Sequence, residues 1–429
     1  MVSESRKQYK IGELYDSSSG LSKSRKEFGF GYPFLTFKEV FNNYFIPDSL
    51  EYLANTSEKE RQRCSIKKGD IFITRTSETQ DELGMTSVAL KDYPNATFNG
   101  FTKRLRLKSS VNVQVNNKYI GYYLRSPKIR SQITSFSSLT TRASLNNSML
   151  NMIEIELPHL DQQKAIATIL SSLDEKIETN NEINEKLEEL AQAIFKQWFI
   201  DFEFPNEEGK PYKSSGGKMI ESELGMIPEG WEVGSATEQF SVQSGGTPKT
   251  NIAKYWDGDI PFFTPKDSHI ESIFVLATEK NITQEGLSKC NSKLYETGTI
   301  FITARGTVGN IAMAGREMAM NQSCYALVAN DGFAPTYIYF LVSHLVDKLK
   351  ANASGSVFGA IIVSTFTNLK AVIPNKVLIK EYDSIVESLF SEILSNSKEN
   401  RNLASIRDTL LPKLMSGEIR LPLEVGKTS

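Results

Sequence analysis

The residues in this sequence whose types and spacing could do chemistry are cations arranged along one short run. The letters "KRLRLK" cover Lys103–Lys108, and the alternation of an extended strand would place Arg104, Arg106 and Lys108 on one face. The intervening leucines would occupy the opposite face, over a core. Lysine and arginine neutralise phosphates, and arginine, lysine, asparagine or glutamine can discriminate base edges. The run is therefore a candidate DNA contact. An ordinary solvent-facing strand explains it equally well, and the second half of the chain has the neutral "SCYALVA" at the corresponding place.

Other candidate contacts lie in predicted loops and near predicted strand ends, where they could meet a phosphate backbone. In the first half these are Lys23, Arg25, Lys26, Lys38, Arg75 and Arg142, and in the second half they are Thr247, Lys249, Lys266 and Arg305. The "SGGT" that ends at Thr247 could also offer backbone N–H groups to a phosphate, because glycine allows close approach. A plain turn is the alternative explanation for this segment.

The sequence contains no constellation typical of catalysis or metal binding. Its three cysteines and three histidines are scattered without ligand spacing. It has no GxxxxGK[ST] phosphate loop and no Asn/Asp-Pro-Pro-aromatic tetrad of an amino-methyltransferase. Asp174 and Lys176 have the spacing of a nuclease motif, but they lie in an acidic helical segment, where chance explains them better. We therefore expect no catalytic residue, no metal and no cofactor bound by this chain.

The charge of the chain is unevenly distributed, although the formal net charge is only −2. Residues 1–158 carry 23 Lys and Arg against 16 Asp and Glu, a net of +7, whereas residues 159–208 carry 4 against 12, a net of −8. A basic half is compatible with DNA binding because local charge decides it. No apolar run reaches the roughly 18–20 residues of a membrane span. The N-terminus has no apolar signal region either, so we expect a cytoplasmic protein with no membrane partner.

The predicted strands and helices that must position these residues occur as an internal sequence repeat. "GDIFITR" (Gly69–Arg75) has an echo in "GTIFITAR" (Gly298–Arg305), and "IELPHL" and "AVIPNK" each lead from a predicted strand into a long helical pattern. With the offset that joins Pro158 to Pro374, the two helical patterns align without a gap. The sequence therefore predicts two copies of a strand-rich module, each followed by a long helix.

The two predicted helices share a heptad seam with asparagines at its centre. In the first helix the seam runs over Leu173–Trp198 and includes Asn180 and Asn184, and the same offset gives Asn396 and Asn400 in the second helix. A buried seam asparagine costs stability but fixes register, because only a matched partner satisfies its amide. If the helices pair antiparallel, the asparagines should meet. The alternative is a solvated break between shorter helices.

These patterns predict an α+β fold of two tandem strand-rich α/β modules and two helices that pair as an antiparallel coiled coil with pseudo-two-fold symmetry. The expected boundaries are 1–158 for the first module, 159–204 for the central helix, 205–228 for a linker, 229–373 for the second module, 374–418 for the C-terminal helix and 419–429 for a tail.

The whole chain resembles the DNA-specificity subunit of type I restriction–modification enzymes. The resemblance rests on "LPHLDQQKAIATILSSLDEKI", on "SELGMIPEGWEV", and on "SGGTPKT", "YWDGDIPFFTPKD" and "GTIFITARGTVG" in the second module. It implies that each module is a target recognition domain that reads one half of a bipartite site in double-stranded DNA. It also implies that the helices set the spacer and dock two modification (methyltransferase) subunits, which restriction (nuclease/translocase) subunits join. The subunit itself would be non-catalytic, with S-adenosylmethionine, and ATP with Mg, bound by its partners.

Two other readings compete with this resemblance. A stand-alone sequence-specific DNA-binding regulator, built from the same repeat, would bind its site without methyltransferase partners. A fused methyltransferase or nuclease would need a catalytic tetrad or a carboxylate set, which the sequence lacks.

Overall fold

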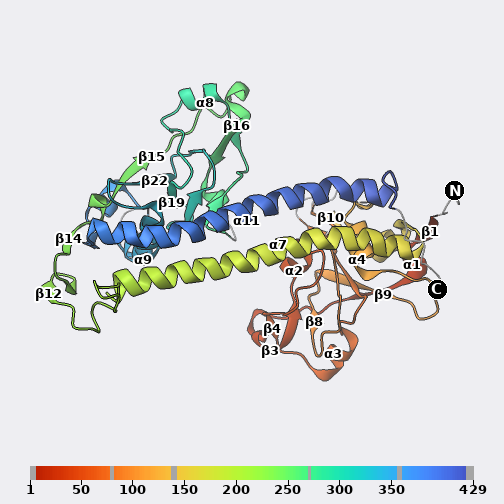
Figure 1. The fold of residues 1–429 in the computed structure, drawn as a ribbon. Helices are drawn as coiled ribbons and strands as arrows, with labels where there is room; N and C mark the ends of the chain where they lie inside the picture. Colours follow the sequence, from red (N-terminus) through yellow and green to blue (C-terminus); the bar gives the residue numbers. More distant parts are fainter. Residues whose placement is uncertain (1–5, 78–81, 137–142, 269–271, 355–359, 422–429) are drawn as a thin grey trace, which may run out of the picture. The chain divides into compact units, whose positions relative to one another are not determined.

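The computed structural model describes residues 6–77, 82–136, 143–268, 272–354 and 360–421. Its internal contacts divide the chain into two compact units, residues 1–175 with 403–429 and residues 176–402. Each unit holds one strand-rich module and a part of each long helix, α7 and α11 (Figure 1). The predicted mixed α+β class is confirmed.

The first module is made of short strands and short helices ahead of α7. Its strands are β1 (Lys7–Lys10), β2 (Tyr15–Ser19), β3 (Phe28–Leu35), β4 (Leu53–Ala54), β5 (Ile71–Thr74), β6 (Thr76–Ser77), β7 (Thr86–Val88), β8 (Thr97–Phe98), β9 (Thr102–Leu107), β10 (Ala143–Ser144) and β11 (Glu154–Leu157). Its helices are α1 (Ile11–Leu14), η1 (Arg25–Glu27), α2 (Phe37–Asn42), α3 (Glu58–Arg63), α4 (Asn117–Leu124), α5 (Pro127–Phe136) and α6 (Asn147–Met152).

The second module has the same kind of composition ahead of α11. Its strands are β12 (Met219–Ser222), β13 (Gly225–Pro228), β14 (Glu232–Ser235), β15 (Phe240–Ser244), β16 (Trp256–Phe263), β17 (Phe274–Val275), β18 (Asn281–Ile282), β19 (Ile300–Thr303), β20 (Ile311–Ala314), β21 (Ala319–Met320), β22 (Cys324–Ala329) and β23 (Lys370–Ile373). Its helices are η3 (Ala236–Glu238), η4 (Ala253–Tyr255), η5 (Pro265–Ser268), α8 (Gln284–Ser288), α9 (Pro335–Ser354) and α10 (Val363–Thr367).

The two modules share one strand topology. The main sheet has the order β2-β9-β5-β7 in the first and β15-β22-β19-β20-β17 in the second. A small sheet follows the same rule in both, because its middle strand pairs antiparallel with one neighbour and parallel with the other: β3 with β4 and β8, and β16 with β18 and β21. The ribbons β1-β11 and β14-β23 also correspond. The duplication predicted from the repeated phrase is confirmed.

The repeated Ile-Phe-Ile-Thr is the central strand of each module, buried on both faces. In β5, Ile71 and Ile73 belong to the cluster that includes α4 and the first turns of α7, whereas Phe72 belongs to the opposite cluster and meets the ring of Phe98 at 4.9 Å. In β19, the two isoleucines and Phe301 divide between two clusters in the same way. Successive side chains of a strand point to opposite faces, so a strand covered on both sides must be apolar throughout.

The threonine that ends this phrase fixes the loop that follows it. The Thr74 hydroxyl accepts from the Met85 N–H at 2.9 Å, and the Thr303 hydroxyl accepts from the Asn310 N–H at the same distance. The preceding residue is in both cases a glycine with positive φ, 72° at Gly84 and 85° at Gly309, and its N–H donates to the threonine carbonyl. The loop in the first module is longer, but it leaves and rejoins the sheet through the same hydrogen bonds.

A long helix follows each module. α7 covers Leu160–Phe195 and continues through the π-helical turn η2 (Lys196–Ile200), while α11 covers Lys376–Ser416. At 1.5 Å per residue, each is about 55–60 Å long. None of the helices in the described ranges combines the length and the hydrophobicity that a membrane crossing needs.

The segment 205–228, predicted as a linker, is more ordered than its composition suggests. It ends in the β12–β13 hairpin, whose turn uses Gly225 at a φ of 98°. Tyr212 stacks on Phe204 with ring centroids 4.5 Å apart, and Phe204 stacks on Trp231 at 5.3 Å. These aromatic contacts attach the segment to the second unit.

Candidate nucleic-acid interface

The four seam asparagines meet across the two helices within the second unit. The Asn180 amide donates to Asn400 Oδ1 at 2.8 Å, and the Asn396 amide donates to Asn184 Oδ1 at 3.0 Å. The partner of the later residue of α7, Asn184, is the earlier residue of α11, Asn396, and this reversed order requires an antiparallel arrangement. Asn180, Asn184 and Asn396 are buried, so a solvated helix break is wrong. The role of these amides in fixing register stays a prediction.

The cationic side of β9 does not form the solvent-facing ribbon that its alternation suggested. Arg104 is buried and donates to the Ser65 carbonyl at 2.6 Å. Arg106 makes a bidentate contact with the buried Asp70, with both N···O distances at 2.6 Å, and this hydrogen-bonded carboxylate raises the arginine pKa. The loop before β5 covers this face, and sequence alternation alone could not reveal it.

The end of β9 departs from the expected pattern as well. Lys108 Nζ donates to the Gly12 carbonyl at 2.6 Å, so it closes a contact inside the module. Leu107, expected over a core, is exposed.

In the basic loop before β3, one cation forms ion pairs within the module and two cations are exposed to solvent. Lys23 pairs with Glu27 at 3.3 Å and with Glu60 at 2.9 Å, and its side chain is 9% exposed. The Ser57 N–H, and then Lys23, lower the pKa of Glu60 to about 2. Arg25 and Lys26 are exposed at this site, as is Lys38 at the start of α2.

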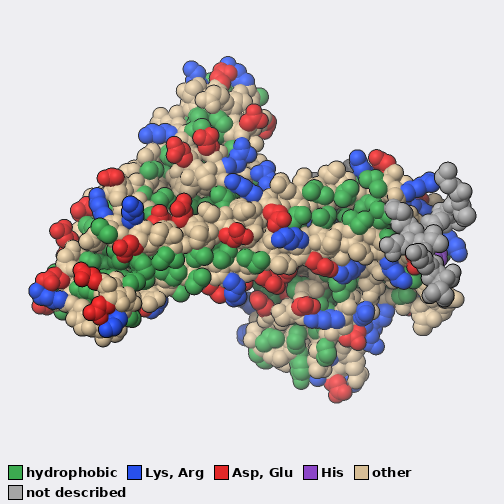
Figure 2. Space-filling view, in the orientation of Figure 1, with side chains coloured by type: hydrophobic (Ala, Val, Ile, Leu, Met, Phe, Trp, Pro, Cys, Tyr) green, Lys and Arg blue, Asp and Glu red, His purple; other side chains and the backbone are tan. Residues whose placement is uncertain are grey.

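Exposed aromatic side chains lie beside these cations and were missed by the sequence reasoning. Phe28 and Phe30 of β3 are 42% and 51% exposed, and Tyr52 is 49% exposed. The Arg61 guanidinium covers the Tyr32 ring at 3.8 Å. β3 and β4 lie on the side of the module away from α7, and Figure 2 shows hydrophobic side chains over them. The signal was "FGFGY", in which glycines separate aromatics that no core could bury.

The second module presents fewer free cations. Lys249 and Arg305 are exposed, and Arg305 lies in the turn after β19. Lys266 is exposed but pairs with Glu279 at 3.2 Å. The Thr247 hydroxyl contacts the Gln322 side chain. The N–H of Gly246 donates to the Met320 carbonyl, which favours the plain-turn reading of "SGGT".

Arg75 and Arg142 are the remaining residues of the first module that were predicted as DNA contacts. Arg75 leaves the sheet at the end of β5, beside Lys103 of β9. Lys103 was not predicted as a candidate, because strand alternation assigns it to the face of Leu105, over the core. Arg142 lies outside the described residues.

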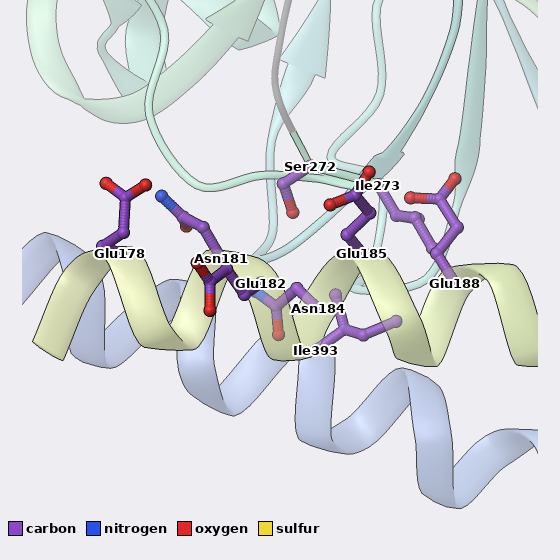
Figure 3. Close-up of a pocket in the computed structure, with 9 residues that line it drawn as sticks. All are labelled: Glu178, Asn181, Glu182, Asn184, Glu185, Glu188, Ser272, Ile273 and Ile393. Atoms are coloured by element: carbon purple, nitrogen blue, oxygen red, sulfur yellow. The ribbon is translucent and has the colours of Figure 1, made fainter. Parts of the chain in front are cut away.

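The acidic face of α7 borders a pocket in the second unit that is unsuited to DNA. Figure 3 shows Glu178, Glu185 and Glu188 projecting from α7 toward the loop that carries Ser272 and Ile273. The cavity measures about 390 Å³. Burial raises the pKa of Glu188. Carboxylates at this density repel phosphates.

Comparison with known proteins identifies the family. A sequence model described as the type I restriction modification DNA specificity domain matches residues 4–189 and 228–402. The MjaIX specificity subunit of Methanocaldococcus jannaschii is 28% identical and the HindI specificity subunit of Haemophilus influenzae 25%. The alignments cover 96% of this chain in both cases, and 92% and 99% of the relatives. A crystal structure of the type I S subunit from M. genitalium has the same fold, with a TM-score of 0.57, 17% identity, and coverage of 96% of this chain and 97% of that one. The chain therefore belongs to the type I restriction–modification DNA specificity subunit family.

Proposed function

We propose that this chain recognises DNA for a type I restriction–modification complex and that each module reads one half of a bipartite site. The observation that carries the proposal is the duplicated module itself. The two copies keep the same sheet and the same loop anchors at Thr74 and Thr303, while the loops between those anchors differ in length and in charge. A constant scaffold with divergent surface loops is the arrangement expected of two readers of different sequence.

The chain would act as a binding and scaffolding subunit, with chemistry supplied by its partners. Those partners would be two modification subunits, carrying S-adenosylmethionine, and restriction subunits, carrying ATP with Mg. Among the described residues no group of three or more His, Cys, Asp or Glu is placed to hold a metal ion. The complex would work in the cytoplasm, where its DNA substrate lies.

The long helices would space the modules and dock the modification subunits. Apolar side chains remain exposed on both helices: Ile183 and Leu190 on α7 are 40% and 49% exposed, and Ile385 and Ile406 on α11 are 44% and 47% exposed. Exposed aliphatic side chains along a helix are typical of a surface that another protein covers. Leu190 and Ile406 are separated by the same offset as Pro158 and Pro374, so two copies of one partner would meet like residues on the two helices.

The DNA contacts would come from cations that are exposed in each module. In the first module these are Arg25, Lys26 and Lys38, and in the second they are Lys249 and Arg305. Their guanidinium and ammonium groups would contact phosphates and base edges. Lys23 would act indirectly, because its ion pair with Glu27 holds the loop that carries Arg25 and Lys26, while Arg104, Arg106 and Lys108 would stabilise the module.

The experiment that tests this function compares Thr74→Val with Thr303→Val. Each change removes the hydroxyl that anchors the loop after the central strand, and each keeps the volume of the side chain. The chain is expressed with its modification subunits in a host that lacks the corresponding methylation, and the modified adenines are mapped across the genome. We expect one bipartite motif for the wild type.

Each variant should relax one half of that motif and leave the other unchanged. The two variants are matched controls for one another. If both relaxed the same half, or if methylation did not depend on this chain, the proposed function would fail. Tight specific binding by the chain alone, without effect on methylation, would favour a stand-alone DNA-binding regulator.

A further inference from the structure

The exit of the central strand in the first module opens onto a pocket rich in cations and hydroxyl groups. The pocket measures about 420 Å³ and is lined by Arg75 and Thr76, by Lys103, and by the polar segment from Ser144 to Ser148. β6 and β10 pair at its edge, with Thr76 opposite Ser144. Every lining residue named here lies within the described ranges, and none of them is acidic.

Among the described residues, neither cation in this pocket has a counter-ion. Arg75 Nε is buried and has no hydrogen-bond partner among the described residues. Lys103 is 6% exposed, and its ammonium donates to the Asn147 amide oxygen, a neutral group. Burial, and then the charge of Arg75, lower the pKa of Lys103. Two positive charges share one pocket here, and an ammonium has three donors to satisfy.

Among the other cations of the same module, Lys23 and Arg106 are paired with carboxylates, whereas Arg104 and Lys108 donate to backbone carbonyls. Lys23 has Glu27 and Glu60, and Arg106 has Asp70. A buried charge is costly unless an opposite charge accompanies it, and its usual partners in proteins are carboxylates. The pocket of Arg75 and Lys103 therefore presents positive charge and hydrogen-bond donors for an anion that no residue in the described ranges provides.

The corresponding place in the second module is neutral, which gives an internal comparison. The N–H of Arg75 donates to the Phe101 carbonyl, next to β9, as the N–H of Ala304 donates to the Ser323 carbonyl, next to β22. Strand register pairs Lys103 with Ile73 and Tyr325 with Ile302. Ala304 and Tyr325 therefore replace the two cations.

Aromatic packing fills that place in the second module. The Tyr325 ring meets Phe366 edge-on at 5.9 Å. The scaffold does not need charge at this position, so the pair of cations is particular to the first module.

We propose that Arg75 and Lys103 form an oxyanion site that binds one phosphate group. A guanidinium can hold two phosphate oxygens in a planar fork, while an ammonium acts as a point charge beside it. The neighbouring hydroxyls of Thr76 and Ser144 can donate to the remaining oxygens. The phosphate could be a phosphodiester of the bound DNA, which rests on the proposed function, or free inorganic phosphate.

Whether the bound phosphate group belongs to DNA is tested by the salt dependence of DNA binding. The full chain, assembled with its modification subunits, is titrated with its methylated motif by fluorescence anisotropy over a range of salt. Each phosphate contact contributes about 0.9 to the slope of log K against log salt. Lys103→Met and Arg75→Met should each lower the slope by up to about 0.9, and the double variant by about 0.9 in total, because they hold one phosphate.

Two controls separate this effect from general loss of charge or fold. Arg75→Lys keeps the charge and should keep the slope. Lys91→Met removes a lysine of the same module that already pairs with Asp48 at 2.8 Å, and it should leave the slope unchanged. The recognised motif should not change, since a phosphate contact positions the protein without reading sequence. Circular dichroism verifies that each variant is folded.

The free-phosphate source is tested on the chain alone. Inorganic phosphate should raise the melting temperature of the wild type relative to chloride at equal ionic strength, and Lys103→Met should abolish that rise. A changed slope without this rise assigns the site to DNA, and the rise without a changed slope assigns it to free phosphate. If neither quantity moves in the folded variants, the proposal is overturned. If the wild-type complex binds no specific DNA, the proposed function fails and the phosphate titration alone decides the pocket.

Discussion

The asparagine pair formed by Asn184 and Asn396 should couple the two helices by an amount that a double-mutant cycle can measure. Both side chains are buried, and the Asn396 amide donates to Asn184 Oδ1 at 3.0 Å. Asn396→Leu removes this bond and leaves the Asn184 amide buried without that partner. A buried polar group that loses its partner costs about 1–3 kcal/mol, whereas replacing both partners by apolar groups is nearly neutral or stabilising.

We therefore expect Asn396→Leu to lower the local opening free energy of the helix pair by about 1–3 kcal/mol. The double variant Asn184→Leu/Asn396→Leu should recover most of that loss, because leucines there would join the cluster that contains Ile393. The coupling between the two sites should thus be about 2 kcal/mol. The double variant should also fix the helix register less strictly, since an apolar seam accepts more than one alignment.

Native-state hydrogen exchange is the suitable assay, because a chain with two units need not unfold in one step. Peptides from residues 176–190 and 390–402 report on the two helices, and a tenfold change in exchange corresponds to about 1.4 kcal/mol. Ser395→Leu, at an exposed position of α11, is the matched control and should leave the exchange unchanged. If the loss in the double variant equals the sum of the two single losses, the sites are not coupled and the role given to the asparagine pair is refuted.

Three further predictions follow from polar contacts and burial elsewhere. Asp174 accepts from Arg407 Nη1 at 2.6 Å and from the Tyr122 hydroxyl, so Asp174→Asn should destabilise the first unit by about 2 kcal/mol, measured as faster exchange in residues 160–175; unchanged exchange would contradict this. The pKa of Glu60 is depressed to about 2, so its stabilisation of the basic loop is full above pH 4.5 and is lost as the pH falls toward 2. Acid should therefore increase exchange near α3, and Glu60→Gln should remove this pH dependence. Burial raises the pKa of Cys324 to about 12, so at pH 8 iodoacetamide should label the less buried Cys290 first; prior labelling of Cys324 would count against the packing of β22.

Much of the fold follows from local sequence pattern. Ile-Phe-Ile-Thr reads as a strand, and its two copies disclosed the duplication because a strand buried on both faces tolerates few substitutions. The helical seam was equally accessible, because one offset in the sequence aligns the asparagines of both helices.

The contacts of the cations were less accessible, because their partners are distant in the sequence. The contacts of Arg106 with Asp70 and of Lys108 with the Gly12 carbonyl depend on the position of β9 between β2 and β5 in the sheet. The repeated phrase does not align its arginines. Both copies of the phrase reach an arginine, Arg75 and Arg305, but the backbone hydrogen bonds make Ala304 the residue equivalent to Arg75.

The threonine and glycine that bracket the loop after the central strand have a consequence for how such a chain can change over generations. The hydrogen bonds of Thr74 with Gly84 and Met85 close the loop at its base, as those of Thr303 with Gly309 and Asn310 do in the other module. Lengthening a loop that is closed in this way costs little, because closure entropy grows only logarithmically with length. Insertions, deletions and exchanges between these anchors can therefore be tried by mutation or recombination while the sheet beneath stays intact, so a new DNA preference can arise without a new fold.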